Sequence, residues 1–193
     1  MTQDRVRALR NLEYRDPRPF LVRLRELEPR VAESNLPTKV KNLRTNPLKW
    51  SRQLREGALF CYGMSQRIGQ TVFLSPSEDE DRDYDIVASW TVDETHHLAP
   101  VQLKTLVPHD LNPSASVQQV VDALGKKYTD SADLTVAIYL NRQIHFDPSR
   151  VVIPSLKLAG LWVFGAISED GREWALWGDF LQTPVGTRFE YPT

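Results

Sequence analysis

Residues 100–141 limit the fold more than any other part of this chain of 193 residues. They contain the alternating run PVQLKTLV, an amphipathic helical stripe after Ser116, and the continuous apolar run DLTVAIYLN. A strand, a helix and a further strand in this order form a crossover, which makes the two strands parallel. A strand that is apolar throughout is typical of the interior of a sheet. The sequence therefore predicts a sheet that is flanked by helices.

The segments on either side of this crossover add antiparallel strands. Residues 70–75, 83–90 and 100–107 read as a three-stranded meander, with an acidic loop at 75–83 and a turn at 91–99. The tail reads as a hairpin around the turn EDGR. Residues 48–68 have helical spacing, and Gly69 follows as the expected cap. The expected fold class is α/β (α+β), with a mixed central sheet flanked by helices.

The first 47 residues differ in character from the rest. Residues 4–33 are predicted to form two helices that are separated near Pro17 and Pro19, and residues 34–47 read as a linker. We therefore divide the chain into a basic helical extension, residues 1–47, and an α/β domain, residues 48–193.

Charge is distributed unevenly along the chain. Residues 1–60 carry fourteen Lys and Arg against seven Asp and Glu, whereas the remaining residues carry ten against eighteen. A basic segment suggests a polyanionic partner, because Lys and Arg that neutralise phosphates supply most of the sequence-independent affinity for nucleic acid. A solvated, arginine-rich helix face is the alternative. The candidate phosphate-binding residues are Arg18, Arg23, Arg25 and Arg30.

Several classes of protein find no support in the sequence. No stretch approaches the roughly 20 apolar residues of a membrane span, so we expect no membrane partner. The charged start of the chain does not resemble a signal segment, and the single cysteine, Cys61, gives no disulfide framework. We therefore expect a cytoplasmic protein. A Gly-rich phosphate loop and a Gly-x-Ser-x-Gly nucleophile motif are also absent from the sequence.

One group of polar residues lies on the predicted meander. Side chains alternate along a strand, so Gln102 and Lys104 share one face while Leu103 and Thr105 share the other. Pairing of this strand with the preceding one can bring Asp85 to the same place. We expect a carboxylate, an amide and an ammonium group to converge near the helix that carries Glu56.

This set of groups suits a metal-assisted reaction. Mg²⁺ prefers oxygen ligands, often one or two carboxylates together with phosphate and water. Asp85, the side-chain oxygen of Gln102 and the backbone carbonyl of Leu103 are the candidate ligands. Lys104 would orient or help deprotonate the attacking water and stabilise negative charge in the transition state.

The order of these residues resembles the PD-(D/E)XK nuclease superfamily, which has the restriction-endonuclease-like fold. The resemblance covers residues 48–141 and rests on Glu56 on a helix, Asp85 on a strand, and Gln102 and Lys104 on the next strand. The Gln-x-Lys form is similar to Mrr-type restriction enzymes and to nuclease domains of bacterial anti-phage systems. Two departures are Tyr84, where the family has Pro, and Gln102, where it more often has an acid.

The resemblance implies a nuclease that requires Mg²⁺ or Mn²⁺ and hydrolyses phosphodiester bonds, with DNA, above all double-stranded DNA, as the expected substrate and bacterial or phage defence as the expected setting. Its catalytic residues would be Lys104, Asp85, Gln102 and Glu56. The alternative is an inactive module of the same fold that binds DNA or supports a larger assembly. The sequence leaves open the choice between DNA and RNA, the mode of cleavage, and whether the chain works as a homodimer or within a larger assembly.

Overall fold

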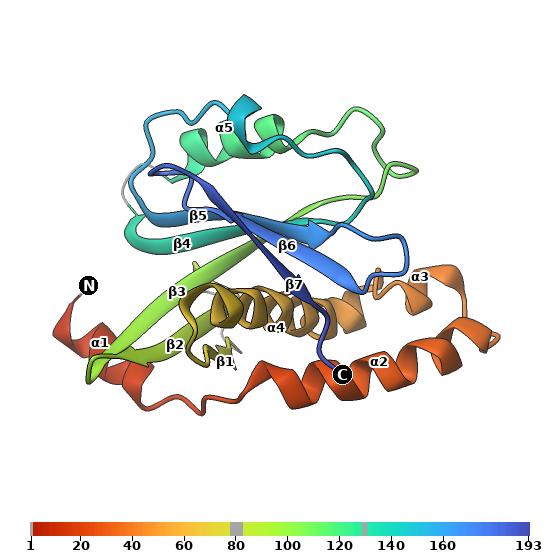
Figure 1. The fold of residues 1–193 in the computed structure, drawn as a ribbon, viewed down its shortest axis with the longest axis horizontal. Coiled ribbons are helices and arrows are strands. Elements are labelled where there is room, and N and C mark those ends of the chain that lie inside the picture. Colours follow the sequence, from red (N-terminus) through yellow and green to blue (C-terminus); the bar gives the residue numbers. More distant parts are fainter. Residues whose placement is uncertain (1, 78–82, 129–130) are drawn as a thin grey trace.

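The computed structural model describes residues 2–77, 83–128 and 131–193. These residues form one mixed sheet and a set of helices around it (Figure 1). The helices are α1 (Gln3–Arg10), α2 (Pro17–Glu33), α3 (Thr38–Lys41), α4 (Lys49–Ile68) and α5 (Val117–Lys127), with the short 3₁₀ helices η1 (Asn46–Leu48) and η2 (Pro148–Arg150). The strands are β1 (Phe73–Pro76), β2 (Ile86–Val92), β3 (Thr95–Leu106), β4 (Ser131–Leu140), β5 (Leu158–Ala166), β6 (Glu173–Gly178) and β7 (Val185–Glu190).

The strands lie in the sheet in the order in which they occur in the chain. β1, β2 and β3 form an antiparallel meander, and β3 pairs with β4 in parallel across the α5 crossover. β5 and β6 form the expected terminal hairpin. The predicted mixed sheet with flanking helices is therefore confirmed at this level.

Two features of the second half of the sheet were not predicted. β5 pairs with β4 in parallel, although the connection between them contains only η2 and no long helix. β7 adds an antiparallel strand beside β6. β7 is mostly exposed and alternates poorly, so its sequence lacks the apolar pattern by which interior strands are identified.

The turn between β2 and β3 is shorter than predicted. Asp93 and Glu94 both have positive φ angles, 46° and 62°, as a two-residue hairpin turn requires. β3 therefore begins at Thr95, and its first residues pair with the end of β2. The stacking of His97 on Trp90, with ring centroids 5.1 Å apart, supports this register. The expectation of a nine-residue turn at 91–99 was wrong, because non-glycine residues can also adopt positive φ.

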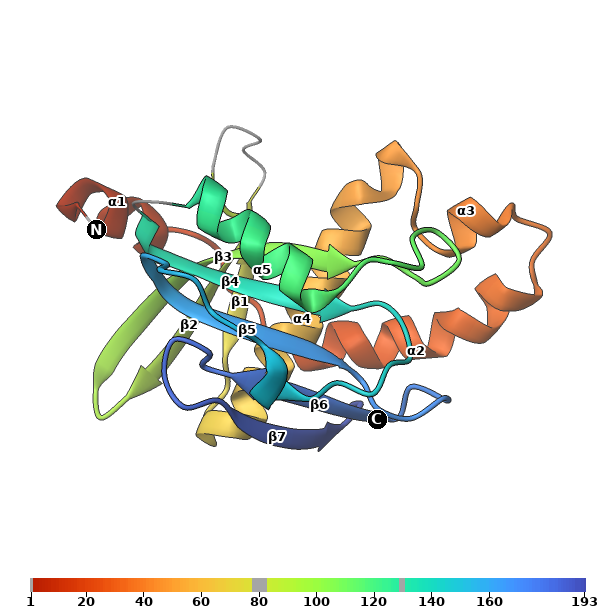
Figure 2. The ribbon, with the colours of Figure 1, turned by 90° about the horizontal axis from the view of Figure 1, so that it is seen from above.

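The sheet has a separate apolar core on each face. α4 covers one face and α5 covers the other, and α2 lies outside α4 (Figures 1 and 2). The α4 core contains Leu59, Val101 and Leu103, and the α5 core contains Leu106 and Val121. Alternate residues of β3 therefore face different helices.

The described part of the N-terminal segment, residues 2–47, packs against the sheet and α4. Leu9 contributes to the α5-side core, and Leu21 is fully buried in the α4-side core. The backbone of Arg15 exchanges two hydrogen bonds with Leu74 of β1. Pro17 is the first residue of α2, behind the N-cap Asp16, so the proline begins the second helix. The division at residue 47 itself remains a prediction.

Two glycines shape the C-terminal end of α4 and its contact with the sheet. Gly69 ends the helix with a φ angle of 69°, as predicted. Gly57 lies against β2, and a Cβ atom at this position would come within 2.9 Å of the Ile86 side chain. The absence of a side chain at Gly57 lets α4 approach the sheet closely, and the preceding residue is Glu56. This packing places the Glu56 carboxylate against the sheet.

Most of the predicted acidic loop, residues 78–82, lies outside the described residues. Ser116 caps α5 through a capping box with Gln119. Among the helices of the described ranges, none is both long enough and apolar enough to cross a membrane.

Candidate functional site

The candidate site lies where β3 changes its pairing partner. From Thr95 to Val101, β3 pairs with β2, and from Val101 to Leu106 it pairs with β4. β2 begins only at Ile86, opposite Val101. Beyond Val101, the edge of β3 that faces β2 is therefore no longer paired with that strand. Asp85, the residue just before β2, lies at this edge.

The Asp85 carboxylate accepts hydrogen bonds from two elements. On β3, the backbone N–H of Leu103 donates to Oδ2 over 2.7 Å, and the side-chain amide of Gln102 donates to the same oxygen. On α4, the amide of Gln53 donates to Oδ1 over 2.5 Å. Asp85 thus joins the end of the meander to α4 and occupies one backbone donor of the β3 edge.

Gln102 and Lys104 lie on the α5 side of the sheet. The Tyr128 hydroxyl, at the end of α5, donates to Oε1 of Gln102 over 3.4 Å. The Lys104 Nζ atom lies 6.0 Å from the centroid of the same tyrosine ring. Both side chains are half-buried. The lysine is therefore held near the site by its strand position and by an aromatic face.

Glu56 lies on the α4 side of β3, where the residue is 2% exposed. Thr105 donates a hydrogen bond to its Oε2 over 3.0 Å, while Oε1 is buried and has no hydrogen-bond partner among the described residues. Burial raises the pKa of Glu56 to about 7, and the negative charge of Asp85 adds to this rise. The Thr105 hydrogen bond and the positive charges of Arg52 and Arg55 act in the opposite direction. A buried carboxyl that titrates near neutrality is common at functional sites.

The structure brings together part of the predicted set. Asp85, Gln102 and the backbone of Leu103 are in direct contact. Lys104 follows on the same face as Gln102, as alternation predicted. Glu56 contacts Thr105, on the opposite face. The expected convergence of these groups near Glu56 is therefore only indirect. Asp85 contacts α4 through Gln53, and Glu56 lies on the opposite face of β3 from Lys104.

Three residues near the site were not singled out from the sequence. Gln53 precedes Glu56 by three positions, which places the two on the same side of a helix, so helical spacing could have found it. Thr105 was assigned to the face opposite Lys104 but not to a partner. Tyr128 ends α5, and no pattern in the sequence indicates that this end of the helix reaches back to β3.

The potential metal ligands at the site only partly fit a divalent cation. Asp85 Oδ, the Leu103 carbonyl and the orphaned Oε1 of Glu56 are oxygens of the kind that Mg²⁺ prefers. Gln102, however, directs its N–H group toward Asp85 and its oxygen toward Tyr128. Across the described ranges, His, Cys, Asp and Glu side chains form no group of three that could hold a metal ion. A cation here would need the amide of Gln102 to turn over.

The four candidate arginines of α2 have different surroundings. Arg18 and Arg30 are exposed near opposite ends of the helix, and Arg23 is exposed between them. Arg25 pairs with Glu28 at 3.0 Å, donates to the carbonyl of Asp170, and lies over the Tyr191 ring. Arg25 therefore joins α2 to the β5–β6 turn and the end of the chain.

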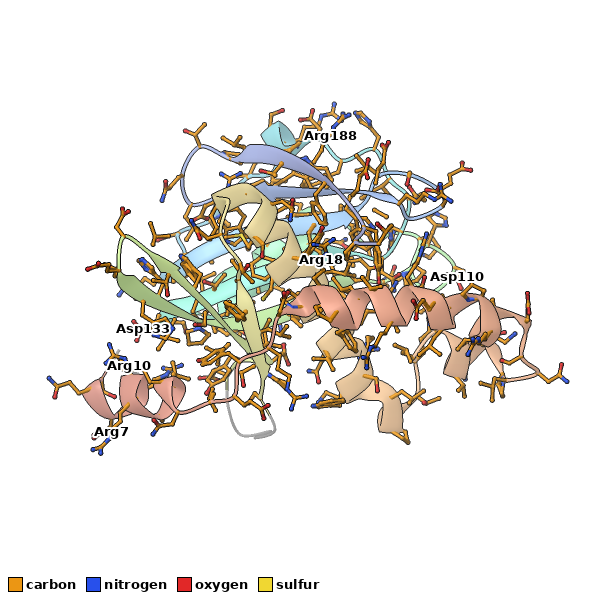
Figure 3. The ribbon with its side chains drawn as sticks, turned by 60° about the horizontal axis from the view of Figure 1, so that its bottom comes forward. Arg7, Arg10, Arg18, Asp110, Asp133 and Arg188 are labelled. Carbon is orange, nitrogen blue, oxygen red and sulfur yellow. The ribbon has the colours of Figure 1, made fainter. Side chains whose placement is uncertain are left out.

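Some of the other basic residues lie away from α2. Figure 3 shows Arg7 and Arg10 on α1 at one end of the molecule, whereas Arg18 lies where α2 begins, beside α4. Arg188, on β7, lies at the top of the view. The positive charge of the first third is thus spread from α1 to α4.

Comparisons with protein-family models, with curated protein sequences and with solved structures each gave no match. The interpretation of the site consequently depends on the residues themselves.

Proposed function

We propose that this protein is a metal-dependent nuclease that hydrolyses phosphodiester bonds of nucleic acid, with double-stranded DNA as the expected substrate. The observation that carries the proposal is the contact of Asp85 with Gln102 and Leu103 at the free edge of β3, next to Lys104. A carboxylate, a backbone carbonyl and a lysine at one strand edge are the groups that a metal-assisted phosphodiesterase needs.

The order of the elements supports the restriction-endonuclease-like core that the sequence resembles. Glu56 lies on the helix before the meander, Asp85 directly precedes the second strand, and Gln102 and Lys104 lie on the third. α5 and the parallel strand β4 then follow in the same order. This agreement covers residues 48–141.

Asp85, Gln102 and the Leu103 carbonyl would hold the cation. When bound, Mg²⁺ or Mn²⁺ supplies charge neutralisation at the phosphate and lowers the pKa of water. A cation beside Asp85 would also reverse the Gln102 amide, because its oxygen would then face positive charge. The Gln102 N–H group would then face Tyr128, whose hydroxyl can accept that hydrogen bond instead of donating one.

The remaining groups act on the nucleophile and on the phosphate. Lys104 donates to a phosphate oxygen or to the attacking water and stabilises the negative charge that develops in the transition state. Glu56, whose buried Oε1 has no hydrogen-bond partner among the described residues, would support the metal or its water. Arg18, Arg23 and Arg30 provide phosphate contacts without sequence preference.

The test is cleavage of plasmid, linear duplex, single-stranded DNA and RNA, each with Mn²⁺, Mg²⁺ or a chelator. We expect Lys104→Ala to lower the cleavage rate at least about a hundredfold, as loss of a transition-state charge partner does. Lys127→Ala is the matched control, since Lys127 lies over the same Tyr128 ring, at 5.1 Å. Equal cleavage by wild type and Lys104→Ala contradicts the proposal.

A second candidate is an inactive module of the same fold that binds DNA or supports a larger assembly. One observation favours it: Gln102 already donates to Asp85, so the polar groups satisfy one another without a cation. Thermal unfolding with and without Mn²⁺ separates the two candidates, because a ligand that binds only the native state raises its stability. The nuclease predicts a rise in Tm that Asp85→Asn abolishes, and the inactive module predicts no rise.

A further inference from the structure

A large groove adjoins the candidate site on the side of β1. Its volume is about 960 Å³, at the upper end of the range of small-molecule sites. It is bounded by the start of α2, the first turns of α4 and the end of β1, through residues that include Phe20, Arg23, Trp50, Leu54 and Ser75. None of these residues belongs to the candidate catalytic set, so the groove is a separate feature.

The groove is connected to Asp85 by short links. Ser77 and Tyr84 both line it, and the backbone N–H of Ser77 donates to the carbonyl of Asp85 over 2.9 Å. On α4, Leu54 lines the groove and its neighbour Gln53 donates to the Asp85 carboxylate. A ligand that fills the groove therefore ends beside Asp85.

The lining combines an exposed aromatic ring with an uncompensated cation. Trp50 is 48% exposed, which is unusual for so large an apolar side chain. Arg23 makes no ion pair with any described residue, whereas the acidic groups of the groove are engaged. Glu13 pairs with Arg15 at 2.9 Å, and Asp16 caps α2 by accepting from the backbone of Arg18.

We propose that this groove binds a short unpaired stretch of the nucleic acid, with a base stacked on Trp50 and a phosphate at Arg23. Stacking on aromatic side chains beside a basic group is the usual way in which single strands are held without sequence preference. The phosphate belongs at Arg23 because the other arginine that lines the groove, Arg15, is already paired with Glu13. This inference rests on the proposed nuclease function, in which the unpaired stretch is the strand that is presented to Asp85.

The experiment measures binding without cleavage. Fluorescence anisotropy follows a labelled oligothymidylate of about twelve nucleotides, and a blunt duplex of the same length, in the presence of a chelator. Trp50→Ala should weaken binding of the single strand about tenfold, the lower part of the range for loss of one stacked base. Trp50→Phe should retain most of the affinity, and duplex binding should be unchanged. Arg23→Gln should weaken the single-strand complex and make it less sensitive to salt.

Two exposed positions on the α5 side provide controls. Val152→Ala removes a side chain that is 71% exposed, and Arg150→Gln removes an exposed cation, so neither should change single-strand binding. Circular dichroism confirms that each variant is folded. Single-strand affinity that is the same for wild type, Trp50→Ala and Trp50→Phe overturns the inference, as does failure of wild type to bind the single strand.

The same proteins separate this inference from the nuclease proposal. If cleavage depends on Lys104 but single-strand binding does not depend on Trp50, the groove inference is overturned and the nuclease proposal is not. Binding that depends on Trp50, in a protein that cleaves none of the substrates, supports the groove and contradicts the nuclease.

Discussion

The two faces of the last part of β3 carry polar groups in very different surroundings. On the α4 face, Glu56 is almost completely buried and receives one hydrogen bond, from Thr105. On the α5 face, Gln102 and Lys104 are half-buried and share the partner Tyr128. Asp85 lies at the edge between them and is hydrogen-bonded to α4 through Gln53 and to β3.

This difference indicates which face of β3 carries the groups that lower the stability of the fold. A carboxylate that is buried with one oxygen unpartnered destabilises the fold when it is ionised. A lysine beside an aromatic ring and near solvent costs little. Changes on the α4 face should therefore alter stability in a pH-dependent manner, whereas changes on the α5 face should leave stability nearly unaltered and act on activity.

The largest effect is expected from Glu56→Gln. Glu56 has a pKa of about 7 in the folded protein against an ordinary value of 4.5, and this difference corresponds to at most about 3 kcal/mol. Because the folded-state pKa is the higher one, the penalty is absent below about pH 4.5 and is complete above pH 7. Wild type should therefore lose stability between pH 5 and pH 8 that Glu56→Gln retains.

Urea unfolding at a series of pH values measures this difference. The informative quantity is the change with pH, since a glutamine amide can also lack a partner at this position. Glu28→Gln is the control, because this half-exposed glutamate pairs with Arg25 and Arg55. If wild type and Glu56→Gln have parallel pH profiles, then Glu56 is not the buried acid described above.

The sequence predicted the elements of the site better than their relative placement. Helical spacing located α4 and its Gly69 cap, and strand alternation correctly separated Lys104 from Thr105. Neither pattern contains the distance between α4 and the sheet, which depends on the close packing of Gly57 against Ile86. Neither contains the register of β2 on β3, which brings Asp85 to Leu103 and depends on positive φ angles at Asp93 and Glu94.

Tertiary contacts also determined the parts of the fold that were not predicted. The parallel pairing of β4 with β5 was missed because residues 142–157 contain no long helix to indicate a crossover. That connection is held by Arg142, which donates to the carbonyls of Val107, Asn112 and Ala115. A side chain that satisfies distant backbone groups has no local signature in the sequence.

A smaller effect is expected from Thr105→Val. Valine has nearly the shape of threonine but cannot donate the hydrogen bond that Glu56 receives. Loss of a hydrogen bond to an ionised group costs about 1.5 kcal/mol, and the cost should be smaller at pH 5, where Glu56 is protonated. Unfolding at pH 8 and pH 5 measures it. Thr105→Ser, which keeps the hydroxyl, should recover most of the loss, and an equal loss in both variants would indicate a packing effect.

The smallest effect on stability is expected from Lys104→Met. Methionine keeps the unbranched apolar stem, and the Lys104 ammonium group that it removes makes no ion pair with the residues that the structure describes. The free energy of unfolding should change by less than about 0.5 kcal/mol, and equally at pH 5 and pH 8. Cleavage should nevertheless be lost, which would separate the function of the α5 face from the stability of the α4 face. A large loss of stability in Lys104→Met would instead show that both faces of β3 support the fold, and Lys127→Met measures the contribution of the shared Tyr128 contact.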